Sequence, residues 1–130
     1  MSKKQQRAAT PAVRPQQFVP YTTPQTSEIR SLNDAFRRTQ RGGRIFVTAG
    51  VKALGQERVD ALMWKVSEYT AFDEGNDPYG EHDFGSFEDG GEKFFWKIDY
   101  FDPSMSAGSP DPSDPKQTCR VLTPMFASEY

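Results

Sequence analysis

The 130-residue sequence predicts an α+β fold in which helices cover a small antiparallel sheet of about three strands. Two stretches, from Thr26 or Ser27 to Gly42 and from Gln56 to about Thr70, carry apolar residues at helical spacing. Between residues 81 and 101, two strand-like runs flank a turn rich in glycine, which indicates a β-hairpin. The expected order is therefore helix, strand, helix, hairpin and helix.

Residues 1–25 are predicted to form a disordered basic arm ahead of a single domain at 26–130. Proline, glutamine and basic residues dominate the arm, so it buries too little apolar surface to offset the entropy of ordering. Its only cluster of large apolar residues is Phe18, Val19 and Tyr21. These side chains suggest transient docking on the folded part or on a partner, whereas a solvated tail is the simpler interpretation.

The first helix is expected to begin at Thr26 or Ser27, either of which can cap the first backbone N–H groups. Its expected apolar face consists of Ile29, Leu32, Ala35 and Phe36. A β-branched and aromatic run at 44–48 predicts a strand after the double glycine. The second helix repeats its apolar residues at spacings of three and four, namely Val59, Leu62, Val66 and Tyr69.

The hairpin is predicted to have strands at 81–87 and 93–101, because Gly90 and Gly91 supply the positive φ of a tight turn. In the second strand the alternation favours a core face formed by Phe94, Trp96, Ile98 and Tyr100. A last helix is expected after Asp114, which can cap it, with an apolar stripe that includes Val121 and Phe126. Pro124 should bend or break that helix.

The charges are divided unevenly along the chain. Residues 1–44 contain nine basic and two acidic residues, whereas residues 45–130 contain seven basic and sixteen acidic residues. Cys119 is the only cysteine, which excludes an internal disulfide and favours a reducing cytoplasm. The sequence has no apolar run long enough to span a membrane and no secretory signal, so we expect a soluble, cytoplasmic protein.

A candidate basic patch lies at the end of the first helix and just beyond it. It consists of Arg37, Arg38, Arg41 and Arg44. Cations at this position suit the helix dipole, which is the structural interpretation of the cluster. The functional interpretation is that the cluster contacts an anion or a nucleic acid. The basic arm offers a further, weak nucleic-acid contact.

The stretch from Asp73 to Asp102 is the candidate functional region, because it combines an acidic loop, the hairpin and His82, the only histidine. We expect Asp99 and Lys97 to lie across the hairpin from His82. If Asp99 orients the imidazole, His82 is a candidate general base. In the alternative interpretation, His82 forms a hydrogen bond that holds the turn at 77–80. The candidate binding residues are Asp77, Tyr79, Glu81, His82, Asp83, Trp96, Lys97 and Asp99.

Other motifs in this region do not predict a cofactor or a metal ion. Asp83, Phe84 and Gly85 spell the magnesium-binding tripeptide of protein kinases, but the rest of the kinase signature is absent. The acidic loop lacks the glycine and glutamate that a calcium-binding loop places at its sixth and twelfth positions. We therefore expect neither a bound metal nor a cofactor, with a weak surface ion site in the acidic loop as the alternative.

Several segments of the chain together resemble an uncharacterised bacterial domain-of-unknown-function family. They are SLNDAFRRT at 31–39, GGRIFVTAGV at 42–51, NDPYGEHDFGSFE at 76–88, FFWKIDYFD at 94–102 and RVLTPMFASEY at 120–130. The resemblance covers about 29–130 and implies a setting on plasmids or other mobile elements, near genes that counter host defence.

Two functional hypotheses follow. In the first, a non-enzymatic binding or inhibitory protein presents its acidic surface to a nucleic-acid-handling or host-defence protein. In the second, a small hydrolase-like enzyme uses His82 and Asp99 as a general-base pair. A protein partner is expected under the first hypothesis.

Overall fold

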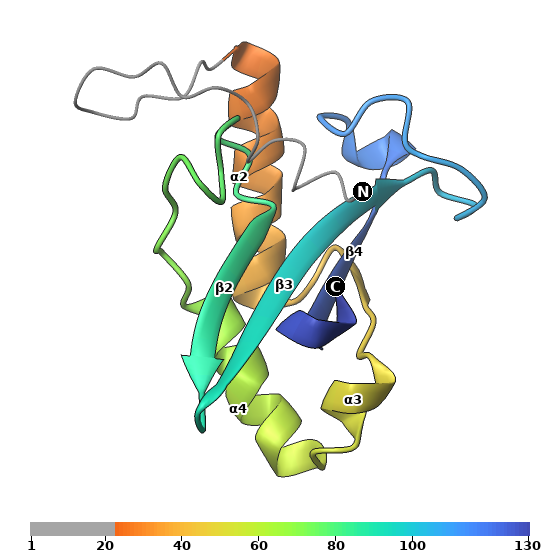
Figure 1. Cartoon of the computed structure of the whole chain (residues 1–130). Helices are drawn as coiled ribbons and strands as arrows, with labels where there is room; N and C mark the ends of the chain where they lie inside the picture. Colours follow the sequence, from red (N-terminus) through yellow and green to blue (C-terminus); the bar gives the residue numbers. More distant parts are fainter. Residues whose placement is uncertain (1–22) are drawn as a thin grey trace.

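The computed structural model describes residues 23–130, so the predicted disorder of positions 1–22 lies outside the described residues. The elements follow one another as α2 (Pro24–Thr39), β1 (Gly43–Ile45), α3 (Ala49–Lys52), α4 (Gln56–Ser67), β2 (Phe84–Asp89), β3 (Glu92–Phe101), the 3₁₀ turn η1 (Pro115–Gln117), β4 (Cys119–Phe126) and the 3₁₀ turn η2 (Ala127–Glu129) (Figure 1). Pro24 and Gln25, which the sequence assigned to the arm, are already helical.

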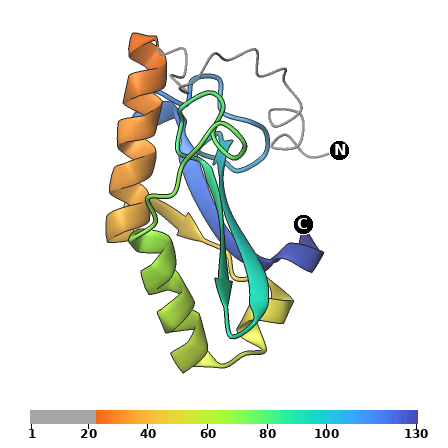
Figure 2. The same ribbon diagram turned by 60° about the vertical axis from the view of Figure 1, so that its left-hand side comes forward.

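The sheet confirms the α+β class but has four strands, in the order β1-β4-β3-β2. β2, β3 and β4 pair antiparallel, whereas β1 runs parallel to β4. The helices α2 and α4 lie on one side of this sheet, as a turned view shows (Figure 2). The molecule therefore has two layers over the described range. No helix between residues 23 and 130 has the length and apolar character needed to cross a bilayer.

α2 begins earlier than expected, because Thr23 accepts a hydrogen bond from the Thr26 backbone N–H and Pro24 occupies the first turn. It ends at Thr39, where Gln40 takes the left-handed conformation with φ of 58°. The following strand passes close to the helix. A Cβ at Gly43 would lie 2.8 Å from the Phe36 ring, so only glycine lets β1 pack here.

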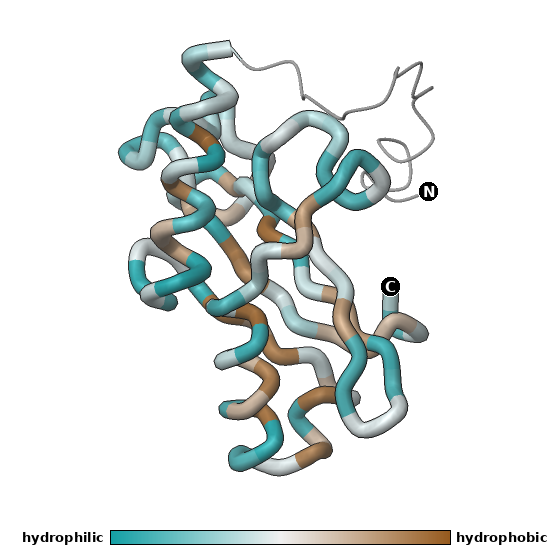
Figure 3. Tube along the Cα trace, turned by 90° about the vertical axis from the view of Figure 1, so that its left-hand side faces the viewer, coloured by the Kyte–Doolittle hydropathy of each residue, from teal (hydrophilic) through white to brown (hydrophobic). Residues whose placement is uncertain are grey.

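The core lies between the two helices and the central strands. The predicted inward face of β3 is confirmed, since Phe94, Trp96 and Ile98 are each at most 1% exposed. They pack against apolar residues of α2, α4 and β4, including Phe36, Leu62, Val66 and Leu122. Apolar positions accordingly recur along the helices and strands in Figure 3, while the connections between them are mostly hydrophilic.

The predicted last helix is wrong. Asp114 does cap a turn that starts at Pro115, but this is the single 3₁₀ turn η1, and the apolar run after it forms β4. β4 lies between β1 and β3, and the side chains of both of its faces are buried from Arg120 to Met125, so the period-two alternation of a half-exposed strand is missing.

Pro124 is tolerated inside this central strand because of where its nitrogen points. The Leu122 carbonyl accepts a hydrogen bond from Phe46 at the β1 side, and backbone groups two residues apart point the same way. Pro124 therefore faces the β1 side as well, beyond the point where β1 ends at Ile45. Its missing N–H costs no bond to β3.

The hairpin is confirmed around Gly90 and Gly91, whose φ values are 62° and 79°. Its first strand, however, starts at Phe84 and not at Glu81. Residues 81–83 belong instead to a loop that α2 holds in place.

Candidate functional site

Four polar residues of α2 form a stripe that faces the loop at 73–83. Arg30, Asn33, Asp34 and Arg37 follow the i, i+3, i+4, i+7 spacing of one helix face. The Arg30 guanidinium donates to the Gly80 carbonyl at 2.9 Å. The Asn33 amide donates to the Glu81 carbonyl at 3.0 Å. This stripe holds the loop in place, although the loop lies about fifty residues further along the chain.

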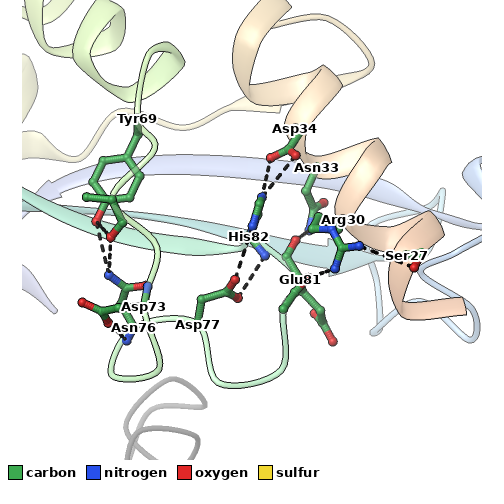
Figure 4. Close-up of polar contacts among 12 residues, drawn as sticks. Ser27, Arg30, Asn33, Asp34, Tyr69, Asp73, Asn76, Asp77, Glu81 and His82 are labelled. Carbon is green, nitrogen blue, oxygen red and sulfur yellow. Dashed lines mark hydrogen bonds and ion pairs between the residues drawn. The ribbon is translucent and has the colours of Figure 1, made fainter. Parts of the chain in front are cut away.

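His82 lies between two carboxylates at the centre of this contact (Figure 4). Its Nδ1 is 2.9 Å from Asp34 Oδ1 and 3.1 Å from Asp34 Oδ2, and its Nε2 is 3.6 Å from Asp77 Oδ2. Its backbone N–H donates to Asp77 Oδ1 at 3.0 Å, with φ at 56°. The ring stacks parallel on Phe72, with 3.8 Å between the ring centroids. Both ring nitrogens therefore face carboxylates, and 25% of the side chain is exposed.

Asp34, Asp77 and His82 form a polar centre, and Arg37 connects it to the core. Arg37 is 1% exposed and donates to Asp34 at 2.9 Å and to the Tyr69 carbonyl at 3.2 Å. Its guanidinium also lies over the Phe72 and Trp96 rings, 5.2 and 5.3 Å from their centroids. Burial alone would raise the pKa of Asp34, but hydrogen bonds from His82 and Arg37 outweigh it and lower that pKa.

A second chain of hydrogen bonds anchors the same loop to the sheet. Arg120 Nε donates to Asn33 at 2.6 Å, Asn33 donates to the Tyr100 hydroxyl at 2.8 Å, and that hydroxyl donates to Glu81 at 2.7 Å. Burial, together with the charges of Asp83 and Glu81, raises the pKa of Tyr100 well above its usual value. Tyr100 therefore stays neutral and acts as a donor.

The predicted pairing of His82 with Asp99 does not form. Asp99 binds Lys97 at 2.9 Å, and both residues point to the sheet face opposite the helices. They were expected near His82 because the hairpin was predicted to begin at Glu81. The observed partner, Asp34, lies 48 positions away in the sequence.

The other candidate binding residues separate into three groups. Trp96 is completely buried and cannot contact a partner. Asp77 and Asp83 are 2% and 3% exposed, so they belong to the interior of the loop. Tyr79 and Glu81 are more accessible, and Tyr79 is 43% exposed.

Arg37 does not belong to the predicted basic surface patch, because it is buried beside Asp34. Arg38, Arg41 and Arg44 are exposed, and within residues 23–130 none of them forms an ion pair. Over the same described range, no three His, Cys, Asp or Glu side chains are arranged to hold a metal ion.

An exposed face of α4 was not among the predicted sites. Glu57, Asp60, Trp64 and Glu68 recur there at spacings of three and four, and Trp64 is 64% exposed. The basic residues Arg58 and Lys65 of the same helix turn toward the hairpin, where both bind Asp89 at 2.8 Å. The outward face of α4 is therefore acidic around one large aromatic side chain. Its sequence signal was the position of Trp64 outside the apolar stripe.

A groove of about 780 Å³ lies on the sheet face that α2 and α4 leave uncovered. Its apolar lining includes Phe46, Phe101, Met105, Val121, Met125 and Tyr130. Arg44, Lys97, Asp99 and Glu129 add charged groups at its walls. Phe46 is 60% exposed, which leaves an aromatic ring accessible at one side of the groove.

Comparison with known proteins places most of this fold in one family. The model of a family described as a protein of unknown function, DUF3768, matches residues 47–129. The chain belongs to this family. The DUF3768 match includes Asp77, His82 and the face of α4, whereas the polar stripe of α2 precedes it. No curated protein and no solved structure matches the chain.

Proposed function

We propose that the chain is a non-enzymatic binding or inhibitory protein of a bacterial mobile element, such as a plasmid or phage. Its acidic surface contacts a basic groove on a nucleic-acid-handling or host-defence protein of the cytoplasm. The mobile-element setting and the defence-related partner are supported by the family resemblance. The cytoplasmic setting is supported by the single cysteine.

The observation that carries this proposal is Trp64 on the acidic face of α4. Tryptophan is enriched among the residues that dominate binding energy in protein interfaces, and here one is 64% exposed. Glu57, Asp60 and Glu68 lie within about one helical turn of it or of each other. An aromatic anchor surrounded by carboxylates suits a basic partner surface.

The charge of the whole described range supports the same partner chemistry. Residues 23–130 contain twelve basic and eighteen acidic residues, a net charge of −6. Such a charge accelerates association with a basic partner and loses its effect when salt screens it.

The enzymatic alternative, a small hydrolase-like protein with a His82/Asp99 pair, receives no support from the site. Asp99 is bound to Lys97 on the other face of the sheet, and each ring nitrogen of His82 faces a carboxylate.

The proposal is tested by capture of partners from a bacterial host lysate with the full-length protein at low and high salt. Three variants are compared with the wild type: Trp64→Ala, a charge-neutralised α4 (Glu57→Gln with Asp60→Asn and Glu68→Gln), and Phe46→Ala. Phe46→Ala is the matched control, because Phe46 is about as exposed as Trp64 but lies at the groove on the opposite sheet face, away from α4.

For a captured partner, Trp64→Ala should weaken binding by about 2 kcal/mol, roughly thirtyfold. Neutralised α4 should bind more slowly and with less dependence on salt, while Phe46→Ala should bind like the wild type. Binding that is insensitive to salt and to both α4 variants would contradict the proposal.

A further inference from the structure

The two outer edges of the sheet differ in how their backbone groups are bound. At the β2 edge, the Ser86 N–H donates to the Tyr69 hydroxyl at 3.3 Å, and the Glu88 carbonyl accepts from the Lys65 ammonium at 3.4 Å. Lys65 belongs to α4, and Tyr69 follows that helix directly. Side chains therefore occupy backbone groups of β2 that would otherwise be open to another strand.

The β1 edge has no such cover. The Phe46 N–H donates to Leu122 of β4, and backbone groups alternate along a strand, so Ile45 and Val47 turn their N–H and C=O groups away from the sheet. In the part of the chain that the structure describes, no hydrogen-bond partner lies next to these outward groups. The β1 edge is therefore open to pairing with a further strand.

A cleft of about 450 Å³ lies beside this open edge, between the β1 segment and α4. Its apolar lining comes from both elements and consists of Ile45, Val47, Val59, Met63 and Trp64. Asp60 also lines the cleft; it is exposed and forms no ion pair within residues 23–130. Unpaired backbone groups, an apolar cleft and a carboxylate thus lie next to one another.

From these observations we propose that β1 binds an extended segment of the partner as an additional strand of the sheet. Hydrogen bonds to the Ile45 and Val47 backbone supply the pairing, and alternate side chains of the segment face the cleft. The segment carries an apolar residue for the cleft and, two positions away, lysine or arginine for Asp60. This inference rests on the proposed function, because Trp64 and Asp60 belong to the acidic face of α4.

Linear peptides test the site directly on the full-length protein. A displayed library of random peptides is selected against the immobilised wild type, and the most enriched peptide is synthesised. Enriched sequences should combine an apolar residue with lysine or arginine two positions away. Asp60→Asn should weaken binding of the synthetic peptide by about threefold, whereas Asp99→Asn, the matched control on the opposite sheet face, should leave it unchanged.

Backbone methylation shows whether the peptide binds as a strand. Two versions of the peptide carry N-methyl groups on alternate residues, one on the odd positions and one on the even positions. Each version blocks one edge of an extended peptide and keeps every side chain. One version should bind about thirtyfold more weakly, because it loses its donors to β1, and the other should bind like the unmodified peptide.

Hydrogen exchange of the protein locates the bound peptide. Saturation with the peptide should slow exchange at the Ile45 and Val47 amides on the order of tenfold or more, because their N–H groups gain partners. The Ser86 amide is the control, since its outward N–H is already bound by Tyr69 at the other edge, and its exchange should not change.

Four outcomes would overturn the proposal. The first is a selection that enriches no peptide, and the second is an equal effect of the two methylation patterns. The third is a complex in which Ile45 and Val47 exchange as fast as in the free protein. The fourth is protection of these amides before any peptide is added, which would identify a second copy as the occupant if it increases with protein concentration.

Failure of this inference and failure of the proposed function give different results. Capture of a partner that requires Trp64 but leaves the Ile45 and Val47 amides unprotected would retain the proposed function and exclude the added strand. Peptide-dependent protection of these amides, with partner capture that is insensitive to Trp64→Ala and to salt, would exclude the proposed function and retain the peptide site.

Discussion

At the residue scale, Asp34 is the side chain on which the polar centre depends. It accepts from the buried guanidinium of Arg37 at 2.9 Å and contacts the His82 imidazole at the same distance. A buried guanidinium without a carboxylate partner is costly, because its charge has been removed from water. Asp34 therefore supports both the packing of Arg37 against Trp96 and the position of the loop at 73–83.

Replacement of Asp34 by asparagine should lower the free energy of unfolding by about 2 kcal/mol at neutral pH, since charge-assisted hydrogen bonds to Arg37 and His82 are lost. The pKa of Asp34 is lowered in the folded protein, so the stability it contributes is present above its unfolded pKa of about 3.9. That contribution is lost as the pH falls through the folded pKa, and the variant and the wild type should converge at the acid end of a urea-denaturation series.

Asp99→Asn is the matched control for this series. Asp99 forms a salt bridge with Lys97 in which both side chains are about one-third exposed, so its loss should change stability by less than about 1 kcal/mol. An equal effect of the two substitutions at neutral pH would contradict the role of Asp34.

The partner of His82 could not be predicted from neighbouring residues, because Asp34 comes from a helix far away in the chain. The sequence nevertheless contained a usable signal. Arg30, Asn33, Asp34 and Arg37 repeat at helical spacing beside the apolar face of the same helix. A second stripe that mixes both charges indicates a polar contact to another segment, although the sequence does not specify which segment.

At the element scale, the position of β2 depends on Gly85. This residue pairs with Trp96 of β3, and a Cβ added to it would clash with the Trp96 ring and lie 2.7 Å from the Tyr69 ring. Trp96 is completely buried and cannot move aside. The edge strand can therefore approach the core only through glycine.

Gly85→Ala should lower the free energy of unfolding by about 1–3 kcal/mol through overpacking, as measured by chemical denaturation. Gly108→Ala is the control, because its Cβ would meet nothing closer than 3.9 Å and its φ is not positive. If Gly85→Ala were as stable as Gly108→Ala, the close packing of β2 against Trp96 would be incorrect.

The elements that were predicted correctly have one face in the core and the other in water. α2, α4 and β3 repeat their apolar residues with the period of their own geometry, so the sequence specifies their type and most of their buried face, although Ala35 of the predicted α2 face is exposed. β4 is buried on both faces, and its short apolar run matches a helical stripe as well as a strand. A proline is normally excluded from a central strand, so Pro124 favoured a broken helix. The sequence does not reveal that β1 ends before Pro124 and leaves its nitrogen without a strand to pair with.

At the scale of the whole molecule, the sheet order determines which parts unfold last. β3 and β4 each have a paired strand on both sides, whereas β2 lies at one edge and β1 at the other. β1 pairs with β4 over only three residues. Local opening of β1 breaks few contacts, whereas opening of the central strands β3 and β4 breaks many.

Native-state hydrogen exchange should therefore be slowest at the amides of β3 and β4, at a free energy close to that of global unfolding. Directly after β1, the Phe46 N–H donates to the Leu122 carbonyl and should be protected. The Ile45 N–H points away from β4, because backbone groups alternate along a strand, and should exchange faster than that of Phe46. The exposed connection at 103–107 provides the reference for fast exchange. Exchange across 119–125 as rapid as in that connection would contradict a central β4, because a strand paired on both sides cannot open without disrupting the sheet.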